Sequence, residues 1–290
     1  MVVSGKTKVY GVIGDPVEHS LSPIIQNAAF AASKLDCTFL GFNVKTAEIG
    51  NAIKGMRALG ILGLNVTMPY KKAVISFLDE IDQTATLLNA VNTIQNKDDK
   101  IIGFNTDGIG ALNALKNNGI DPKGKKIVLL GAGGAARAIA FALAEEAEEF
   151  SILNRTMKPA VDLANNLKQK FSGSKVIVYT FSKLAIKANV AAADLLINAT
   201  SVGMHPNPDQ TIVERKWLKP KSTVMDIVYN PVETKLSKDS KAIGAKVISG
   251  VEMLIYQGAA SFEIWTGHKA PVEVMKEAAL NHLQSDKLDG

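Results

Sequence analysis

A glycine-rich loop between a strand and a helix is the first part of the sequence whose residue types indicate a chemistry. The segment GAGG at 131–134 follows four apolar residues, Ile127–Leu130, that are typical of a buried parallel strand. The alanine-rich stretch Ala135–Ala147 predicts a helix, and Phe150–Leu153 predicts a second strand. Backbone N–H groups at such a helix start bind the pyrophosphate of a dinucleotide. A plain strand-to-helix connection also explains these glycines and stays open as an alternative.

The second strand of this unit ends in Asn154-Arg155-Thr156. An NAD site usually has an acidic residue here, which binds the ribose 2′-hydroxyl. This strand end has none, and an arginine between two hydrogen-bonding side chains suits a 2′-phosphate. The sequence therefore favours NADP over NAD, although a polar loop with a solvated arginine has the same composition.

Polar residues also gather at the end of the predicted strand Ile61–Val66, where Asn65, Thr67 and Lys71 follow one another closely. Ligands bind at the carboxyl ends of strands in open α/β sheets. The proline before residue 70 predicts a helix over 70–78, with Lys71 in a first turn whose dipole disfavours a cation. That unfavourable placement favours a functional role for the lysine over simple solvation.

Two serines and an aspartate lie before other predicted helices. Ser22 and Asp107 each fit as a helix cap, and this structural reading competes with a functional one. Ser20 has no such explanation in the sequence, and two hydroxyls beside a helix start can bind a carboxylate. The single cysteine, Cys37, lies in an apolar run and predicts only a buried strand residue.

Strands and helices alternate along all 290 residues, which predicts the α/β fold class. A hairpin over 91–104, followed by a connector that contains glycine and proline, predicts a domain boundary. We expect an N-terminal α/β substrate domain with a mixed sheet, formed by residues 1–107 plus 251–290. Residues 108–250 would form a Rossmann-like dinucleotide domain. The final helices would return to the first domain and leave the ligand between the two.

Composition argues against several other classes of protein. Hydrophobic residues make up 47% of the chain and charged residues 21%, which suits a globular core. The net charge of +5 comes from scattered residues, so nucleic acid is not an expected partner and a small anion is. No apolar run approaches the roughly 18 residues that span a membrane. The first eight residues lack the apolar core of a secretion signal, so a cytoplasmic location is expected.

The sequence resembles the shikimate dehydrogenases over nearly its whole length. The motifs that carry this resemblance occur in family order: GDPVEHSLSP (14–23), NVTMPYK (65–71), AVNT (90–93), GFNTDG (103–108), GAGGAARA (131–138), NRT (154–156), NATSVGM (198–204), D-x-VYNP (226–231) and G-x-x-M-L-x-x-Q (250–257). NVTMPYK and GFNTDG are far more specific than the glycine loop. The resemblance implies NADPH-dependent reduction of 3-dehydroshikimate to shikimate, a step of chorismate and aromatic amino acid biosynthesis.

The resemblance also implies a role for each matching residue. Lys71 and Asp107 would form the catalytic pair. Substrate would bind to Ser20 and Ser22 through its carboxylate, with Tyr229 near that group, and to Asn65, Thr67, Asn92, Asp107 and Gln257 through its hydroxyls; Lys71 would also contact substrate. NADP would bind at Gly131, Ala132, Gly133, Gly134 and Ala135 (pyrophosphate), at Asn154, Arg155 and Thr156 (2′-phosphate), and at Thr200, Val228, Gly250 and Met253 (nicotinamide). No metal is implied, and a homodimer is compatible with the resemblance.

The assigned pair suits the reaction. Hydride delivery to a carbonyl leaves an alkoxide that needs a proton, and Lys71 can stabilise that oxygen and protonate it. Asp107 can orient the lysine and accept a hydrogen bond from the neighbouring hydroxyl. Three rivals are an NAD-preferring quinate/shikimate dehydrogenase, a non-catalytic dinucleotide sensor and a methyltransferase with a glycine loop. The intact Lys71–Asp107 pair argues against the last two.

Overall fold

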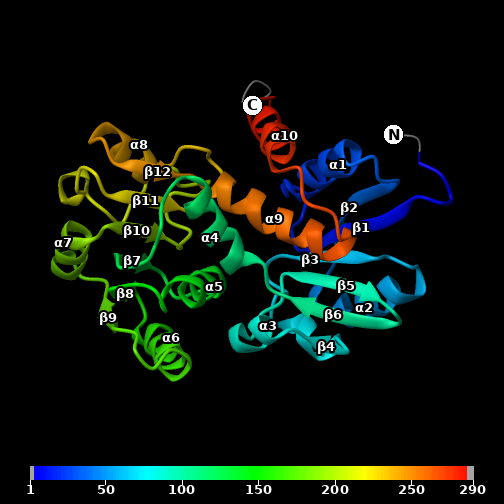
Figure 1. Ribbon diagram of the computed structural model, residues 1–290, viewed down its shortest axis with the longest axis horizontal. Helices are drawn as coiled ribbons and strands as arrows, with labels where there is room; N and C mark the ends of the chain where they lie inside the picture. The colour runs from blue at the N-terminus through cyan, green and yellow to red at the C-terminus, as the bar shows by residue number, and fades with distance from the viewer. Residues whose placement is uncertain (1–2, 286–290) are drawn as a thin grey trace. The chain divides into compact units, whose positions relative to one another are not determined.

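A computed structural model describes residues 3–285 and divides the chain into two compact units. Of the described residues, the first unit holds 3–106 and 255–285, drawn from blue to cyan and from orange to red in Figure 1, and the second holds residues 107–254. The first contains a mixed sheet and the second a parallel one, as the predicted α/β fold class requires. Within residues 3–285, no helix has the length and apolar character needed to cross a membrane.

The first unit is built on a six-stranded sheet with the order β2-β1-β3-β5-β6-β4. Strands β1, β2 and β3 are parallel, β5 is antiparallel to β3 and β6, and β4 is parallel to β6. Its elements are β1 (Lys8–Gly14), α1 (Ser22–Ala32), β2 (Cys37–Asn43), η1 (Thr46–Glu48), α2 (Ile49–Ala58), β3 (Gly63–Val66), η2 (Ala73–Phe77), β4 (Glu80–Ile81), α3 (Gln83–Leu88), β5 (Thr93–Lys97), β6 (Lys100–Phe104) and α10 (Val272–Ser285).

The C-terminal helices return to this first unit, as predicted. Helix α9 (Gly250–Thr266) begins in the second unit and ends in the first, and α10 packs beside α1 (Figure 1). The indole Nε1 of Trp265 on α9 donates a 2.9 Å hydrogen bond to the Ile94 carbonyl of β5. The Trp265 ring also lies 5.4 Å from that of Tyr10, whose pKa burial raises to about 12. Buried aromatic contacts therefore fix α9 against the sheet.

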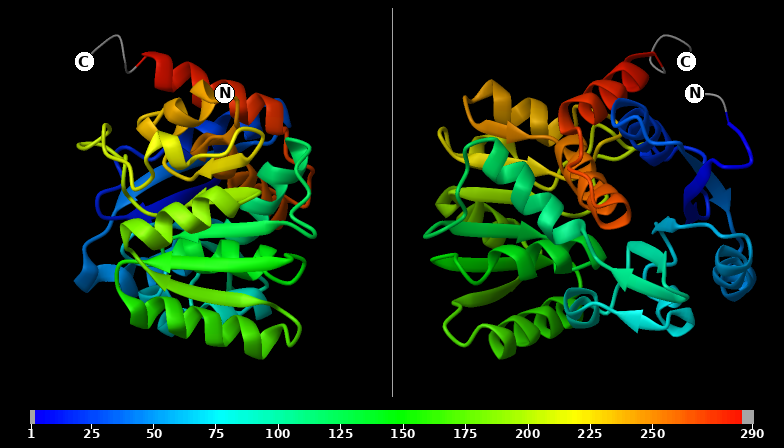
Figure 2. Two further views of the ribbon diagram at one scale, coloured as in Figure 1. Left: turned by 90° about the vertical axis from the view of Figure 1, so that its left-hand side faces the viewer. Right: turned by 45° about the vertical axis from the view of Figure 1, so that its right-hand side comes forward.

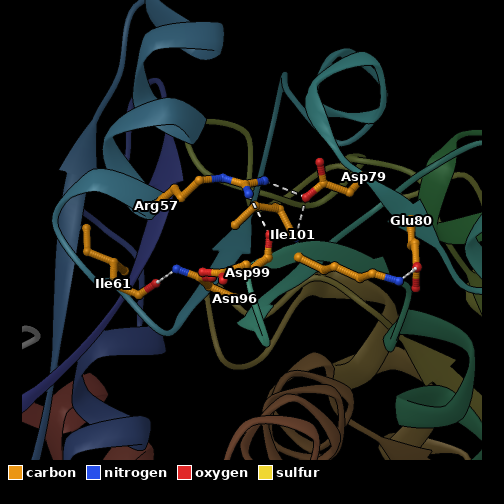
Figure 3. A network of polar contacts seen from close by, with 8 residues as sticks. Arg57, Ile61, Asp79, Glu80, Asn96, Asp99 and Ile101 are labelled. Carbon is orange, nitrogen blue, oxygen red and sulfur yellow. Dashed lines mark hydrogen bonds and ion pairs between the residues drawn. The ribbon is translucent and has the colours of Figure 1, made fainter.

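A network of polar contacts holds the β5–β6 hairpin against α2 (Figure 3). Arg57 on α2 donates to Asp79 Oδ2 and to the Asp99 carbonyl, each at 2.5 Å. The same carboxylate oxygen accepts the Ile101 N–H of β6 at 2.6 Å. The Ile101 N–H, aided by Arg57, holds the pKa of Asp79 below its ordinary value. One carboxylate thus joins three segments of the chain.

We expect Asp79→Asn to unfold at a lower temperature than the wild-type protein at about pH 7, because the charge-assisted bond to Arg57 is lost. A carboxyl whose pKa is lowered on folding stabilises the protein above its ordinary pKa and loses that effect as the pH falls through the lowered value. The two melting temperatures should therefore converge at an acidic pH below that lowered pKa. Glu80→Gln, which removes the neighbouring ion pair with Lys100, serves as control. A difference that is the same at both pH values would contradict this role.

The second unit has a six-stranded parallel sheet with the order β12-β11-β10-β7-β8-β9, which is the order of a Rossmann fold. Its strands run side by side in the left view of Figure 2. The elements are α4 (Asp107–Asn117), β7 (Lys126–Leu130), α5 (Gly134–Leu143), β8 (Glu149–Asn154), α6 (Met157–Lys170), β9 (Val176–Thr180), α7 (Lys183–Ala192), β10 (Leu195–Asn198), η3 (Arg215–Trp217), β11 (Thr223–Asp226), α8 (Lys235–Ala242) and β12 (Lys246–Ile248).

The predicted helix over 70–78 is wrong. The chain makes a turn at 70–72 and then the short 3₁₀ helix η2. Hydrogen bonds to other segments hold the residues on both sides of η2, and these limit the length of the helix. At the start, Tyr70 is buried and its hydroxyl donates to the Val44 carbonyl at 2.6 Å. Just beyond η2, the Asp79 N–H already donates to Ile101 of β6. Lys71 therefore lies in a turn, and the argument from a helix dipole does not apply to it.

Candidate active site

The register of the first sheet brings three polar motifs to one edge. Asn65 on β3 pairs with Thr93 on β5, and Thr93 pairs with Phe104 at the end of β6. Because β5 is antiparallel to both neighbours, its first residues lie beside the last residues of β3 and β6. NVTMPYK, AVNT and GFNTDG, which are far apart in sequence, therefore meet at this edge.

Asn65 and Asn92 are buried there in a network of amides and hydroxyls. Asn65 Nδ2 donates to the Asn92 carbonyl at 3.2 Å, and Asn92 Oδ1 accepts the Thr106 N–H at 2.8 Å. Asn92 Nδ2 donates to Thr106 Oγ1 at 3.0 Å and to Gln257 Oε1 at 3.4 Å. The structure thus brings together three of the predicted substrate residues, Asn65, Asn92 and Gln257. It adds Thr106, which the sequence analysis did not single out although it lies inside GFNTDG.

Lys71 belongs to the same edge through its backbone. Its carbonyl accepts the Val91 N–H at 2.7 Å, one residue before Asn92. Thr67, also predicted to bind substrate, follows β3 and donates its N–H to Ile13 of β1 at 3.0 Å. The turn that carries Lys71 is therefore fixed on one side by β1 and on the other by the AVNT segment.

Ser20 and Ser22 lie at the start of α1, but Ser22 does not act as the predicted cap. Leu21 occupies the N-cap position and Ser22 is the first helical residue. Ser20 Oγ accepts the Ser22 N–H at 3.3 Å, so it has a structural role that the sequence analysis did not see. The two hydroxyl groups lie beside one helix start, as a carboxylate site there requires.

Asp107 opens α4 in the second unit, where it is the first helical residue and not the cap before it. It is 5% exposed. A carboxylate in the first turn is stabilised by the N–H groups and dipole of the helix. Tyr229, after β11 in the same unit, is partly buried, and this burial raises the pKa of its hydroxyl.

The glycine loop after β7 fits a pyrophosphate group. Gly131 has φ +108°, and a Cβ there would lie 2.8 Å from the Ala199 carbonyl oxygen, so only glycine suits this position. Gly133 and Gly134 are exposed, and a Cβ on either would meet open space. Helix α5 begins at Gly134 with no side-chain cap on its first N–H groups. Those donors and the space before them are what a pyrophosphate at a helix start uses.

The predicted 2′-phosphate residues lie together between β8 and α6. Asn154 closes β8, and its Nδ2 donates to the Thr156 carbonyl at 2.7 Å, which fixes the short loop between them. Arg155 projects from this loop as an exposed residue. Because β8 is next to β7 in the sheet, this loop lies one strand away from the glycine loop.

A buried carboxylate organises the predicted nicotinamide residues. Asp226, 1% exposed at the end of β11, accepts hydrogen bonds from Thr234 Oγ1 (2.6 Å), Asn198 Nδ2 (2.9 Å) and Val228 N (3.2 Å). Burial raises the pKa of this carboxyl, and the three hydrogen bonds oppose that rise. Asn198 Oδ1 in turn accepts from Thr200 Oγ1 at 2.7 Å. Thr200 and Val228 are therefore both positioned through Asp226.

Gly250 completes this part of the second unit. A Cβ on Gly250 would lie 2.5 Å from the carbonyl oxygens of Ile227 and Val228, so the start of α9 packs directly on that backbone. Met253 follows on α9 and is buried. Within residues 3–285, no group of three or more His, Cys, Asp or Glu side chains is placed to hold a metal ion.

Comparison with known proteins decides the family. The profile described as shikimate dehydrogenase substrate binding domain matches residues 12–94, and those described as shikimate / quinate 5-dehydrogenase and shikimate 5′-dehydrogenase C-terminal domain match residues 113–239 and 250–280. The chain is 48% identical to the shikimate dehydrogenase (NADP(+)) of Methanopyrus kandleri over 97% of this chain and 98% of that one. The enzyme of the same name from Methanocaldococcus jannaschii is 46% identical over 97% and 99%. The chain belongs to the shikimate dehydrogenase family.

Solved structures share the fold over nearly the full length. A crystal structure of a shikimate dehydrogenase in complex with NADP⁺ superposes with a TM-score of 0.91 at 46% identity, covering 97% of this chain and 98% of that one. The Listeria monocytogenes shikimate 5-dehydrogenase in complex with shikimate and NAD gives 0.89 at 36% identity, covering 95% and 97%. A 5-ketofructose reductase of Gluconobacter gives 0.86 at 33% identity, covering 96% and 99%. The family fold thus serves more than one substrate, and side chains must select among them.

Proposed function

We propose that this protein reduces 3-dehydroshikimate to shikimate with NADPH, and catalyses the reverse reaction with shikimate and NADP⁺. The prediction of an NADP-dependent shikimate dehydrogenase is confirmed at the level of the family, since close relatives over nearly the whole chain carry that name. The NAD-preferring alternative is not favoured. The homodimer, the absence of nucleic acid binding and the cytoplasmic location stay predictions.

The observation that carries the proposal is the polar edge of the first sheet. Asn65 is only 5% exposed, and its Oδ1 is buried without a hydrogen-bond partner among the described residues. A buried acceptor without a partner costs free energy unless a ligand supplies a donor. Asn65 lies in the same network as Asn92 and Gln257, which suits a substrate with several adjacent hydroxyl groups.

The second unit supports NADP as the cofactor. Its open glycine loop, uncapped α5 and exposed Arg155 suit the pyrophosphate and 2′-phosphate, and Thr200, Val228, Gly250 and Met253 would hold the nicotinamide end. NADPH supplies the hydride when it is bound. Ser20 and Ser22 would hold the carboxylate of the substrate, with Tyr229 near it.

The proton is moved by residues of the chain. Lys71 would donate an ammonium hydrogen bond to the substrate carbonyl oxygen and give it the proton as the alkoxide forms. Asp107 would hold Lys71 by its charge and accept a hydrogen bond from the adjacent hydroxyl. In the reverse direction Lys71 would take the proton from the shikimate hydroxyl.

The test is an assay of the purified protein at the absorbance band of reduced nicotinamide, with shikimate or quinate, each with NADP⁺ or NAD⁺. We expect turnover with shikimate and NADP⁺, and a much lower kcat/KM with the other three pairs. Faster turnover of quinate with NAD⁺ would replace the proposed function by the NAD-preferring alternative. Absence of turnover with all four pairs would indicate a dinucleotide sensor.

A further inference from the structure

Two buried hydroxyls lie against the asparagine amides of the polar edge: Thr93 on β5 contacts both Asn65 and Asn92, and Ser261 on α9 contacts Asn65. Their oxygens lie 2.8 Å apart, and both residues are 0% exposed. Asn65 Nδ2 lies 3.1 Å from Ser261 Oγ and 3.3 Å from Thr93 Oγ1. Thr93 Oγ1 also lies 2.9 Å from Asn92 Oδ1. All four residues belong to the first unit.

The hydroxyl groups of this cluster suit an Asn65 side chain whose Nδ2 faces them. Each hydroxyl has one proton to donate and two lone pairs. Ser261 can donate to the Gln257 carbonyl at 3.1 Å, and Thr93 can donate to Asn92 Oδ1; Thr106 Oγ1 lies 3.3 Å from Ser261 Oγ and 3.4 Å from Thr93 Oγ1. With those two donors so placed, the single Thr106 proton can occupy only one lone pair, and both hydroxyl oxygens keep a lone pair for the Asn65 amide nitrogen.

The backbone supports the same orientation. The Asn92 carbonyl can only accept, and it lies 3.2 Å from Asn65 Nδ2. A reversed amide would place two oxygens against each other at that distance and leave the carbonyl without this donor. With Nδ2 facing these three acceptors, Oδ1 faces the other way and is the buried oxygen that lacks a partner.

We infer that Thr93 and Ser261 are positioning residues that orient Asn65 and Asn92 toward the hydroxyl groups of the substrate. The inference rests on the proposed function. Neither hydroxyl needs to touch substrate, because Thr93 and Ser261 act through the amides of the two asparagines. Ser261 also joins α9 to the sheet edge one helical turn after Gln257, and its hydroxyl contacts the backbone carbonyl of that third residue proposed to bind substrate.

The test compares two substitutions of nearly equal size at one position. Thr93→Val keeps the shape of the side chain and removes the hydroxyl, whereas Thr93→Ser keeps the hydroxyl and removes a methyl group. We expect Thr93→Val to raise the KM for shikimate at least about tenfold, the effect of losing one buried hydrogen bond to each asparagine. Thr93→Ser should stay within about threefold of wild type, and the KM for NADP⁺ should change little in either variant.

Substrate analogues distinguish an effect on the orientation of the two asparagine amides from a general loosening of the substrate site. Analogues of shikimate that each lack one ring hydroxyl should bind the wild-type enzyme more weakly, and Thr93→Val should lose much of that discrimination for one of them. Ser261→Ala should act in the same direction. Its matched control is Ser240→Ala, since Ser240 is also a 0% exposed helical serine, with its hydroxyl bonded to the Leu236 carbonyl in α8.

Any one of three results would overturn the inference. The first is an equal rise in the KM for shikimate in Thr93→Val and Thr93→Ser. The second is a rise in the KM for NADP⁺ as large as that for shikimate in both variants, and the third is unchanged discrimination among the analogues in Thr93→Val. If Thr93→Val does not fold, Ser261→Ala against Ser240→Ala decides, because it leaves β5 intact. Failure of the proposed function is separate, since it would appear as absence of shikimate turnover in the wild-type enzyme.

Discussion

Lys71→Ala is expected to lower kcat by about two to four orders of magnitude, the range for loss of a general acid–base group. The reason is chemical: the hydride adds to the carbonyl carbon and leaves an alkoxide oxygen, and without the ammonium group that oxygen loses its proposed proton donor. The KM for shikimate should change far less, because Asn65, Asn92 and the serines of α1 would still bind the substrate. Steady-state kinetics in both directions measure the effect.

The chain supplies a matched control in Lys72→Ala. Lys72 is the next residue of the same turn and is exposed, so its removal changes the local charge equally without touching the proposed chemistry. Its kcat should stay within about twofold of wild type, as for an ordinary surface substitution. A Lys71→Ala enzyme with nearly normal kcat, or a Lys72→Ala enzyme that is equally impaired, would remove Lys71 from the proton transfer.

Local sequence patterns were sufficient to predict the strand–loop–helix of the glycine loop and the β5–β6 hairpin. Ile127–Leu130 and Gly131 carry their own signals, namely an apolar run and a residue that tolerates φ +108°. The return of α9 and α10 to the first unit was predicted as well, because those helices had no partner strands of their own.

Features set by pairing between distant segments could not be predicted. Strand β4 has two residues and is defined only by its parallel pairing with β6. The replacement of the predicted helix over 70–78 by η2 depends on Tyr70 and Asp79 being held by residues elsewhere in the chain. Ser261 gave no signal at all, since its role depends on where α9 meets the pair formed by Asn65 and Thr93.

The motifs located the candidate site, but not its internal connections. AVNT and GFNTDG predicted Asn92 and Asp107, and the neighbours Thr93 and Thr106 were in the same letters without being distinguished. Only the register Thr93–Phe104 places these hydroxyls beside the amides. A motif thus indicates which segment carries chemistry, whereas pairing decides which of its residues touch one another.

Arg155→Ala is expected to raise the KM for NADP⁺ by roughly tenfold to a hundredfold, the effect of losing a charge-assisted contact to a phosphate. The KM for NAD⁺, which lacks the 2′-phosphate, should change little, so the ratio of the two kcat/KM values is the quantity to measure. The neighbouring Asn154–Thr156 hydrogen bond does not involve the guanidinium, so the shape of the loop should survive the substitution.

The control for Arg155 is Lys170→Ala at the other end of α6. Lys170 is exposed and lies in the last helical turn, so its removal changes the net charge by the same amount away from the β8–α6 loop. If the effect of Arg155 came only from the general positive field of the unit, both variants would raise the KM for NADP⁺ alike, and added salt would reduce both effects. A contact at the 2′-phosphate predicts a large change for Arg155→Ala alone. Equal effects of Arg155→Ala on NADP⁺ and NAD⁺ would mean that the 2′-phosphate is bound elsewhere.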